Sequence, residues 1–429
     1  MKITDLRGTN QEDWRLLLAR PVLDTRALEL TVASILEDVK NNGDEAVKKY
    51  SLQFDRISPD QLEVSREEIE ASIDGIDEEL KNAIGLAKSN IETFHRRQVE
   101  ETEYIETMPG VRCWRKPVAI EKVGLYIPGG TAPLFSTLLM LGIPARIAGC
   151  REIVLCSPPD ASGQLHPAIL YAAKLVGVTR IFKAGGVQAI AAMAYGTAIV
   201  PRVYKIFGPG NQYVTCAKQL VQKDGLAIDM PAGPSEVAVY ADETAFPAYA
   251  AADLLSQAEH GPDSQVILVS SSDRMVASIL AEVDKQVEIL PRAAIAKRAL
   301  ENSRVFLVSD DRIAMELLNE YAPEHLILAC DHAEKLAEQV VNAGSVFLGH
   351  FSPESVGDYA SGTNHVLPTN GYARAYSGVS LDSFVKKITF QQLSQDGINR
   401  IGRPVERMAE AEGLQAHASA VKIRRGGVR

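Results

Sequence analysis

The chain has 429 residues, 46% of them hydrophobic, which is enough apolar content for roughly two to four soluble globular domains. Lys and Arg total 45 against 55 Asp and Glu, so the net charge is −10 at pH 7 and a nucleic-acid-binding surface is not expected. Gly, Pro or Arg interrupts every apolar stretch before it reaches about 18 residues, so no membrane span is expected either.

The N-terminus and the cysteines point to a cellular compartment. The opening residues, MKITDLRGTNQEDW, are charged from the second position and lack the apolar core of a signal peptide. The cysteines are odd in number, contain no C-x-x-C pair and lie far apart, at Cys113, Cys150, Cys156, Cys216 and Cys330. Scattered single thiols suit a reducing environment, and we expect a cytoplasmic protein.

In chain order, a small N-terminal segment (1–23) precedes a helical region. Apolar residues recur at three- and four-residue spacing from about Asp24 to Gln98, as in amphipathic helices. Beyond Pro117, short β-rich runs alternate with Ala-rich helices; the runs are REIVLCSPP, TRIFKAGG, VYKIFGPGN, SEVAVYAD, SQVILVSSS and SVFLGHFSP. This alternation predicts an α/β fold with parallel sheets covered on both faces. A helical, charged composition returns over 378–429 and indicates a small C-terminal helical domain.

Three glycine-rich loops are placed where a predicted strand ends and a helix begins: VGLYIPGGTAPLFST, FKAGGVQAIAAMAYG and FGPGNQYVTCAKQL. Glycine allows a ligand to approach the backbone, and a helix N-terminus offers free N–H groups to a phosphate. None of the loops is the full dinucleotide fingerprint, since Tyr213 stands where a third glycine is required. An ordinary turn without a ligand is therefore the alternative for each loop.

The stretch SQAEHGPDSQ (256–265) lies at a predicted helix end, because Gly261 and Pro262 terminate helices. Gln257 and His260 are three residues apart and are expected to share one face, with Glu259 pointing elsewhere. The alternative is a polar last turn in which the histidine only complements the helix dipole.

Three further stretches offer acid, base or metal-ligand chemistry. EYAPEHLIL places Glu324 and His325 just before an apolar strand, where a carboxylate and an imidazole could share acid/base work. ESVGDYASGTNHVLPT collects Glu354, Asp358 and His365 in a polar segment, and AEAEGLQAHASA carries Glu412 and His417 on what reads as a terminal helix. Each stretch could equally be a solvated loop or surface. Together, the N and O donors that could hold a catalytic zinc are Gln257, His260, Asp358 and His417.

These motifs resemble the histidinol dehydrogenase family. The matching segments span nearly the whole chain in order: NIETFH, PGVRCW, VGLYIPGGTAPLFSTLLMLGIPA, GGVQAIAAMAYGT, KIFGPGNQYVT, IDMPAGPSEV, DLLSQAEHGPDSQVIL, YAPEHLIL and GSVFLGHFSPESVGDYASGTNHVLPT. The resemblance implies a zinc-dependent, NAD-linked enzyme that oxidises L-histidinol to L-histidine through an enzyme-held aldehyde, in the last steps of histidine biosynthesis.

The resemblance also implies residue roles. It assigns one zinc per subunit to Gln257, His260, Asp358 and His417, and the acid/base pair to Glu324 and His325. It implies NAD contacts at Tyr126, Gln188 and Asn211, one in each glycine-rich loop. The implied substrate contacts are Ser235, Gln257, His260, His325, Asp358, His365, Glu412 and His417.

The implied architecture is two large incomplete Rossmann-like domains plus small helical N- and C-terminal domains, in an intertwined homodimer whose active site is shared through His417. We accordingly expect 24–123 and 235–377 to form a discontinuous α/β domain that carries the zinc and catalytic residues. Residues 124–234 are expected to form the NAD-binding domain. The alternatives are a related zinc- and NAD-dependent alcohol dehydrogenase for another amino alcohol or diol, a zinc hydrolase that activates water, and a non-catalytic metal-binding module.

Overall fold

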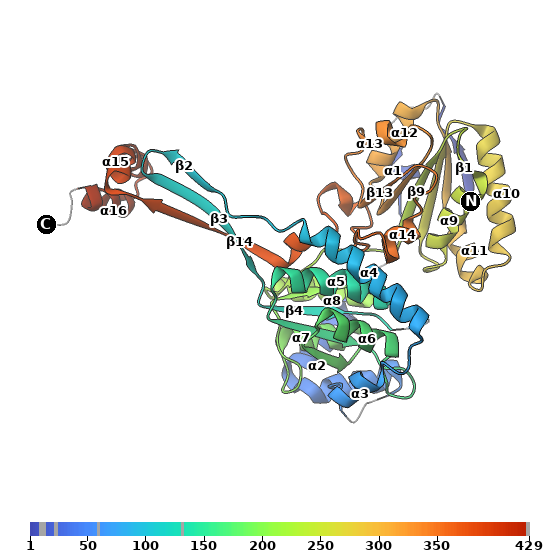
Figure 1. Cartoon of the computed structure of the whole chain (residues 1–429), viewed down its shortest axis with the longest axis horizontal. Helices are drawn as coiled ribbons and strands as arrows, with labels where there is room; N and C mark the ends of the chain where they lie inside the picture. The colour runs from blue at the N-terminus through green and yellow to red at the C-terminus, as the bar shows by residue number, and fades with distance from the viewer. Residues whose placement is uncertain (8–13, 21–24, 58–60, 130–132, 426–429) are drawn as a thin grey trace.

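A computed structural model of the chain describes residues 1–7, 14–20, 25–57, 61–129 and 133–425. Two α/β lobes face each other, and a long arm projects from them and ends in a helix pair near the C-terminus (Figure 1). Each lobe is built on a parallel sheet, so the predicted fold class is confirmed. Within the described residues, no helix is both long and apolar enough to cross a membrane.

The first lobe contains a five-stranded sheet in the order β6-β5-β4-β7-β8, with all neighbours parallel. Most of its strands lie at or next to the predicted apolar runs. They are β4 (Lys122–Tyr126), β5 (Glu152–Ser157), β6 (Arg180–Lys183), β7 (Lys205–Phe207) and the short β8 (Ala227–Ile228). Because β5 and β6 continue to one side of β4 while β7 and β8 lie on the other, the connections diverge between β4 and β7. Such a divergence creates a ligand-binding crevice at the carboxyl ends of the strands.

Helices cover both faces of this sheet. One face packs against α2 (Thr25–Tyr50, continued by a π-helical turn over Ser51–Asp55), α7 (Gly186–Tyr195) and α8 (Gln212–Lys223); the other packs against α3 (Arg66–Ala71), α4 (Glu78–Arg96), α5 (Phe135–Ala148) and α6 (Pro167–Val176). This corrects the expected domain division, which joined 24–123 to 235–377. Val39 and Val47 of α2 are buried with Ile190 and Met193 of α7, so the early helices complete the first lobe.

The second lobe contains a six-stranded parallel sheet in the order β1-β11-β10-β9-β12-β13. Its strands are β1 (Lys2–Asp5), β9 (Glu236–Ala241), β10 (Gln265–Ser270), β11 (Arg304–Leu307), β12 (His325–Ala329) and β13 (Ser345–Leu348). The N-terminal segment, expected as a unit of its own over 1–23, joins this lobe instead. Its strand β1 pairs with β11, and Leu6, Trp14 and Leu18 are buried in the core of this lobe.

Two groups of helices cover the second sheet. One face carries α9 (Pro247–Ala258), α10 (Asp273–Val287) and α11 (Ala293–Glu301); the other carries α1 (Trp14–Leu17), α12 (Asp311–Tyr321) and α13 (Ala333–Ala337). The short helix α14 (Glu354–Tyr359) follows β13 and contacts α9. The predicted stretches around Gln257, Glu324 and Asp358 therefore lie at one end of this lobe.

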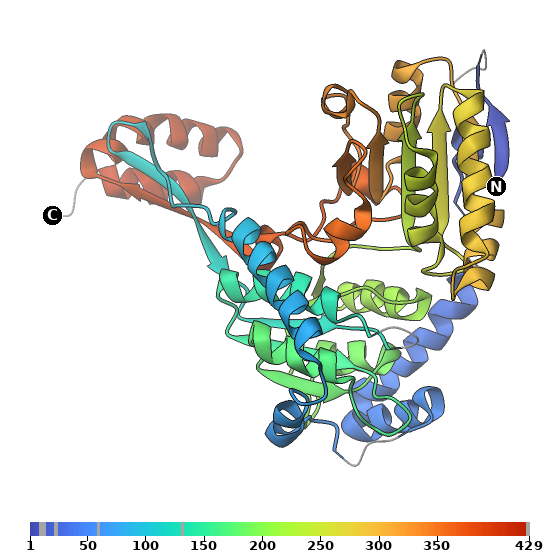
Figure 2. The ribbon, with the colours of Figure 1, turned by 45° about the vertical axis from the view of Figure 1, so that its right-hand side comes forward.

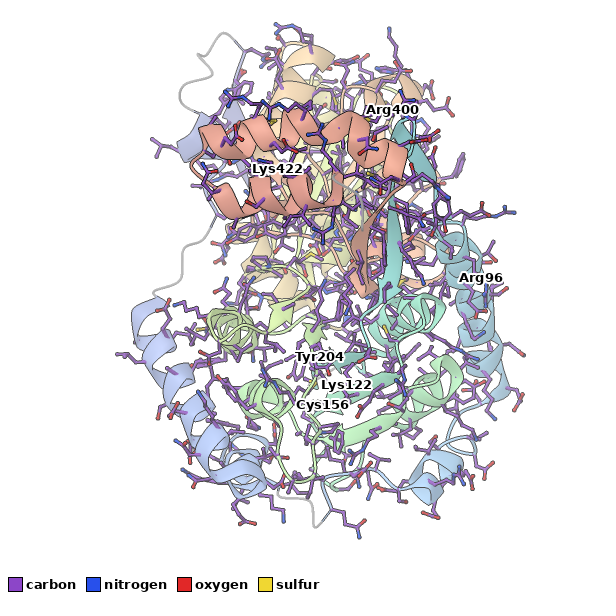
Figure 3. All side chains as sticks on the ribbon, turned by 90° about the vertical axis from the view of Figure 1, so that its left-hand side faces the viewer. Arg96, Lys122, Cys156, Tyr204, Arg400 and Lys422 are labelled. Carbon is purple, nitrogen blue, oxygen red and sulfur yellow. The ribbon has the colours of Figure 1, made fainter. Side chains whose placement is uncertain are left out.

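The arm is an antiparallel sheet in the order β14-β3-β2, tipped by two helices. Its elements are β2 (Tyr104–Met108), β3 (Val111–Ala119), β14 (Val385–Leu393), α15 (Gln395–Ala411) and α16 (Gln415–Arg425), with 3-10 turns at Tyr372–Arg374 and Leu381–Phe384 before it. The helices match the predicted C-terminal domain, but the three strands were not predicted. Seen end-on, the helix pair, with Arg400 on α15 and Lys422 on α16, stands in front of the lobes (Figure 3).

Candidate active site

One cavity of about 210 Å³ between the two lobes gathers most of the predicted site. The first lobe contributes the ends of β7 and β8 and the start of α5, and the second lobe contributes the amino ends of β9 and β12. Figure 2 shows the two lobes facing each other, with the arm projecting to one side. Seven predicted residues line the cavity: Ser235, Gln257, His260, Glu324, His325, Asp358 and His365.

The topology of the second lobe explains why these distant stretches meet. Ser235 immediately precedes β9, and Glu324 immediately precedes the adjacent parallel strand β12. Helix α9 runs back along the sheet after β9, so its last turn, with Gln257, returns to the amino ends of the strands. Helix α14 then brings Asp358 to the same edge. The edge is thus lined by strand starts and helix ends.

His325 is held in one orientation at the floor of the cavity. Its ring is only 3% exposed, and Nδ1 donates to the main-chain carbonyl oxygen of Glu236 at 3.1 Å. Nε2 lies 3.4 Å from Asp358 Oδ1 but has no well-formed hydrogen bond to any described residue. Because a carbonyl can only accept, the neutral ring carries its lone pair on Nε2, which is the atom available for chemistry.

Acidic neighbours set the charge of this ring. Burial opposes the charged form of His325, but Glu324 and Asp358 outweigh it and raise the pKa of the imidazole to about 10. Glu324 Oε2 lies 3.6 Å from Nδ1 and accepts the N–H of Glu236 at 2.8 Å. Burial raises the pKa of Glu324 to about 8, an elevated value typical of carboxyl groups used as acids or bases. The charges of these two adjacent residues therefore influence each other.

Asp358 and His365 form a second linked pair. His365 Nδ1 donates to the carbonyl oxygen of Asp358 at 2.7 Å, and its Nε2 accepts from the hydroxyl of Thr137 at 2.9 Å. Burial lowers the pKa of His365, which favours the neutral ring. Burial would raise the pKa of Asp358, but its contact with His325 and the nearby histidines lower it overall, so the carboxylate is charged. Thr137 lies on α5 of the first lobe and was not singled out from the sequence.

Gln257 supplies the clearest sign that this cavity binds a ligand. The residue is 1% exposed, and its Oε1 has no hydrogen-bond partner among the described residues. A buried acceptor without a partner lowers the stability of the fold unless a donor or a cation binds to it. With His260 and Asp358 lining the same cavity, the donors are an amide oxygen, an imidazole and a carboxylate, a set that fits zinc. Glu259, between Gln257 and His260 in the chain, also borders the cavity.

Glu354 adds a buried carboxyl group to the wall. It is 1% exposed and accepts a hydrogen bond from the hydroxyl of Ser256 at 2.5 Å. Burial raises its pKa to about 8. The sequence placed Glu354 in a polar segment without assigning it a role; its exclusion from water is a tertiary effect that local pattern does not reveal.

The last two predicted residues, Glu412 and His417, are not brought to this cavity by their own chain. Glu412 caps the C-terminal end of α15 and His417 lies in α16, both exposed on the arm. The stretch predicted as one terminal helix is broken at Gly413, whose φ of +74° is left-handed. Figure 1 shows this helix pair well away from the lobes.

A second cavity, of about 770 Å³, lies at the carboxyl edge of the first sheet and is lined by Tyr126, Gln188 and Asn211. The three glycine-rich loops follow β4, β6 and β7, and therefore meet at this edge. Asn211 caps α8, with its Oδ1 accepting the N–H groups of Tyr213 and Val214 at 3.0 and 3.1 Å. The cap uses only the amide oxygen, so the amide NH₂ group is not needed to hold the helix start.

Two buried side chains make this cavity suitable for a polar cofactor. The Tyr126 hydroxyl accepts the N–H of Gly186 at 3.0 Å. Gln188 is fully buried, its Nε2 contacts Asp55 at 3.4 Å, and its Oε1 has no hydrogen-bond partner in the described part of the chain. Burial raises the pKa of Asp55 to about 6. The size of the cavity, its helix starts and this orphaned acceptor fit a dinucleotide.

The loop 208–211 borders both cavities. Gly208 has a φ of +126°, and a Cβ there would lie 2.0 Å from the carbonyl oxygen of Tyr126, so only glycine fits. Asp229 accepts the N–H of Gly208 at 2.8 Å, Lys218 donates to its carbonyl at 2.8 Å, and Lys218 and Asp229 form a buried ion pair. Lys218 and Asp229 lie in the quoted segments FGPGNQYVTCAKQL and IDMPAGPSEV, but neither was singled out from the sequence, because their pairing depends on the fold.

Comparison with known proteins agrees with this geometry. The family model described as histidinol dehydrogenase matches residues 18–425. The chain is 60% identical to histidinol dehydrogenase of Bacteroides thetaiotaomicron over 98% of each chain, and 50% identical to that of Escherichia coli K12 over 98% of this chain and 97% of the relative. The crystal structure of histidinol dehydrogenase from Elizabethkingia anophelis matches with a TM-score of 0.96 at 54% identity, covering 99% of this chain and 98% of that one.

Proposed function

The chain belongs to the histidinol dehydrogenase family, and from this premise we propose that it oxidises L-histidinol to L-histidine in two NAD-linked steps, with a zinc ion in the active site. The observation that carries the proposal is the buried pair Glu324 and His325 in one cavity with Gln257, His260 and Asp358. The alcohol is oxidised to an aldehyde, water adds to the aldehyde, and the hydrate is oxidised to the carboxylic acid.

Gln257, His260 and Asp358 would hold the zinc with His417, and Tyr126, Gln188 and Asn211 would contact NAD. When bound, NAD supplies the hydride acceptor, and zinc supplies a fixed positive charge that orients the substrate and counters the pull of Asp358 on the pKa of His325. The orphaned oxygens of Gln257 and Gln188 support both assignments.

His325 is the base of the first oxidation in this scheme. Its Nδ1–H is fixed on the Glu236 carbonyl, so Nε2 takes the hydroxyl proton of the alcohol as the carbon loses hydride. Nε2 lies beside Asp358, whose carboxylate then stabilises the charged ring. The carbonyl of Glu236 and the carboxylate of Asp358 therefore position the ring before and after proton transfer.

Glu324 is the base of the second oxidation. One of its oxygens is engaged by the N–H of Glu236, which leaves the other free to accept a proton from water as the water attacks the aldehyde. A buried carboxylate binds water protons more strongly than a solvated one, as its raised pKa indicates. Two adjacent residues can thus serve successive steps from the start of one strand.

Substrate binding follows from the charge of the cavity. L-histidinol carries an ammonium group and an imidazole, and the wall offers the carboxyl groups of Glu354 and Asp358 with the hydroxyl of Ser235 and the neutral ring of His365. Glu412 and His417 would come from the arm of a second chain, which makes the active unit a homodimer. A reducing cytoplasm suits the five free thiols of this enzyme. Another amino alcohol with a similar charge pattern is the alternative substrate.

The test is the NADH yield from L-histidinol, with and without a chelator. We expect two NADH per histidinol, loss of turnover on chelation and recovery with zinc. Full activity of a sample shown by elemental analysis to be metal-free would contradict the role of zinc. A yield of one NADH with release of the aldehyde would indicate an ordinary alcohol dehydrogenase, and the absence of NAD binding would favour a hydrolase.

A further inference from the structure

The carboxyl edge of the second sheet, opposite the proposed active site, also carries side chains that could bind a ligand. Strands β9 and β12 are parallel neighbours, ending together at Ala241 and Ala329. From β9 the chain continues to β10 and β11 on one side, whereas β12 and β13 lie on the other. The connections therefore diverge at the carboxyl ends of β9 and β12, which is where open parallel sheets bind ligands. Figure 1 shows α12 and α13 at this outer end of the lobe.

Three metal-binding side chains meet at that point. Asp242 directly follows β9, and Cys330 and His332 follow β12. One ligand atom from each residue lies within 4.8 Å of the other two. His332 Nδ1 is 3.6 Å from Asp242 Oδ2, too far for a hydrogen bond and close enough for both atoms to share a cation.

Surrounding contacts orient the free donor atoms. Asp242 Oδ1 accepts the N–H and the hydroxyl of Thr244 at 2.8 and 2.6 Å, which leaves Oδ2 to face His332. His332 Nε2 donates to Asp311 Oδ2 at 2.8 Å, so the neutral ring carries its lone pair on Nδ1. Tyr240 donates to the other oxygen of Asp311 and holds it in place. A carboxylate that fixes the far nitrogen of a histidine is the usual outer support of a metal ligand.

The thiol does not suit a redox or nucleophilic role by itself. Cys330 is 1% exposed, and burial together with Asp242 raises its pKa to about 12. The thiolate is the form that reacts and that binds metals, and a thiol in this environment reaches it when a cation replaces its proton. The arrangement therefore favours a cation over an oxidant as the species that Cys330 meets.

We propose that Asp242, Cys330 and His332 form a second metal site, for Zn²⁺ or a divalent ion of similar softness. A thiolate and an imidazole select such ions over Mg²⁺ and Ca²⁺, and three protein donors leave a fourth tetrahedral position for water. The site lies at the opposite ends of β9 and β12 from Ser235 and Glu324, about 20 Å away at about 3.3 Å per strand residue. The ion ties together the ends of the two central strands and is independent of histidinol oxidation.

Cobalt distinguishes this site from the active site. The full-length protein is stripped with a chelator and titrated with Co²⁺, and the near-ultraviolet absorption is recorded. We expect a thiolate-to-cobalt charge-transfer band, because Cys330 is a ligand; the proposed active-site donors are all N and O and cannot produce one. The protein should bind one more Co²⁺ per chain than Cys330→Ser, in which the band is lost. Cys113→Ser, on the arm, is the matched control and keeps the band.

Asp311→Asn tests the site with all three ligands intact. It weakens the support of His332 and should lower the Co²⁺ affinity of the thiolate band by about 10–100-fold without abolishing the band at saturation. A wild-type protein without the band at saturating Co²⁺, or a band that persists in Cys330→Ser, overturns the proposal. Because the readout is spectroscopic, failure of this metal-site proposal can be distinguished from failure of the proposed oxidation of histidinol.

Discussion

Nδ1 of His325 lies 3.1 Å from the main-chain carbonyl oxygen of Glu236, and this contact decides which nitrogen of the ring can act as a base. Replacing His325 by Gln keeps a polar side chain but removes the base. We expect oxidation of histidinol to slow by about 10²–10⁴-fold. Single-turnover NADH formation measures the loss, and metal content serves as the control for an intact site. A rate within a few fold of the wild type would exclude His325 as the base.

Glu324 is expected to control the second step. Burial raises its pKa to about 8, so its carboxylate fraction grows as the pH rises through that value. Since only the carboxylate accepts a proton, oxidation of added histidinaldehyde should accelerate between about pH 6 and 9. Glu324→Gln should lose this dependence and slow the aldehyde step more than the alcohol step. Equal losses in the two half-reactions would argue against separate bases.

The ion pair between Arg20 and Glu236 should support the stability of the second lobe. Arg20 Nη2 donates to Glu236 Oε2 at 2.9 Å, and the carboxylate is 3% exposed. Arg20→Met leaves that charge buried without its partner, which typically costs about 3–5 kcal/mol. Arg7→Met, which breaks an exposed pair with Asp273, is the control and should change the unfolding midpoint little. Similar midpoints for the two variants in urea would disprove the assigned difference.

NAD binding should depend on the first lobe alone. Tyr126→Phe removes the acceptor of the Gly186 N–H, and Asn211→Ser removes the amide while keeping a good helix cap. Both variants should bind NAD⁺ more weakly in calorimetric titration and retain the wild-type zinc content. Loss of metal from either variant would mean that these loops belong to the zinc site.

His417 is expected to act across the dimer, since its own arm carries it away from the cavity. His260→Ala and His417→Ala homodimers should both be inactive. In a heterodimer of the two mutants, one site collects both defects and the other collects neither, so one active site should return. Two different affinity tags isolate the heterodimer, and NADH production and zinc content report on its sites. A purified heterodimer as inactive as its parents would rule out a shared site.

The sequence predicts the interior of the lobes better than the arm. Strands such as EVAVYA (236–241) are buried on both faces, and the sequence shows such strands directly as continuous runs of apolar residues. The arm strands, such as YIETM (104–108), are exposed and lack that signal. The packing of α2 against α7 was also missed, because an amphipathic helix reveals its apolar face but not the sheet that will cover it.

The candidate site likewise combines residues that the sequence predicts with residues that it does not. Glu324 and His325 are neighbours in the chain, so their pairing could be anticipated, as could the shared helix end of Gln257 and His260. Thr137 contacts His365 and Asp55 contacts Gln188, each from a different element, and no local sequence pattern predicts these contacts. The path of the arm, which removes His417 from its own cavity, depends on strands that the sequence did not reveal.

The position of β1 has a consequence for biosynthesis. Lys2 pairs with Arg304, so β1, the edge strand of the second sheet, cannot pair until roughly 300 further residues have been synthesised. During that interval the first lobe has all its strands, which lie between Lys122 and Ile228, although Val366, Val379 and Phe384 join its core only later. Leu6, Trp14 and Leu18 can reach their buried positions only when the core of the second lobe forms. The residues of β1 therefore reach their place only after β11, about 300 positions later in the chain, has been made.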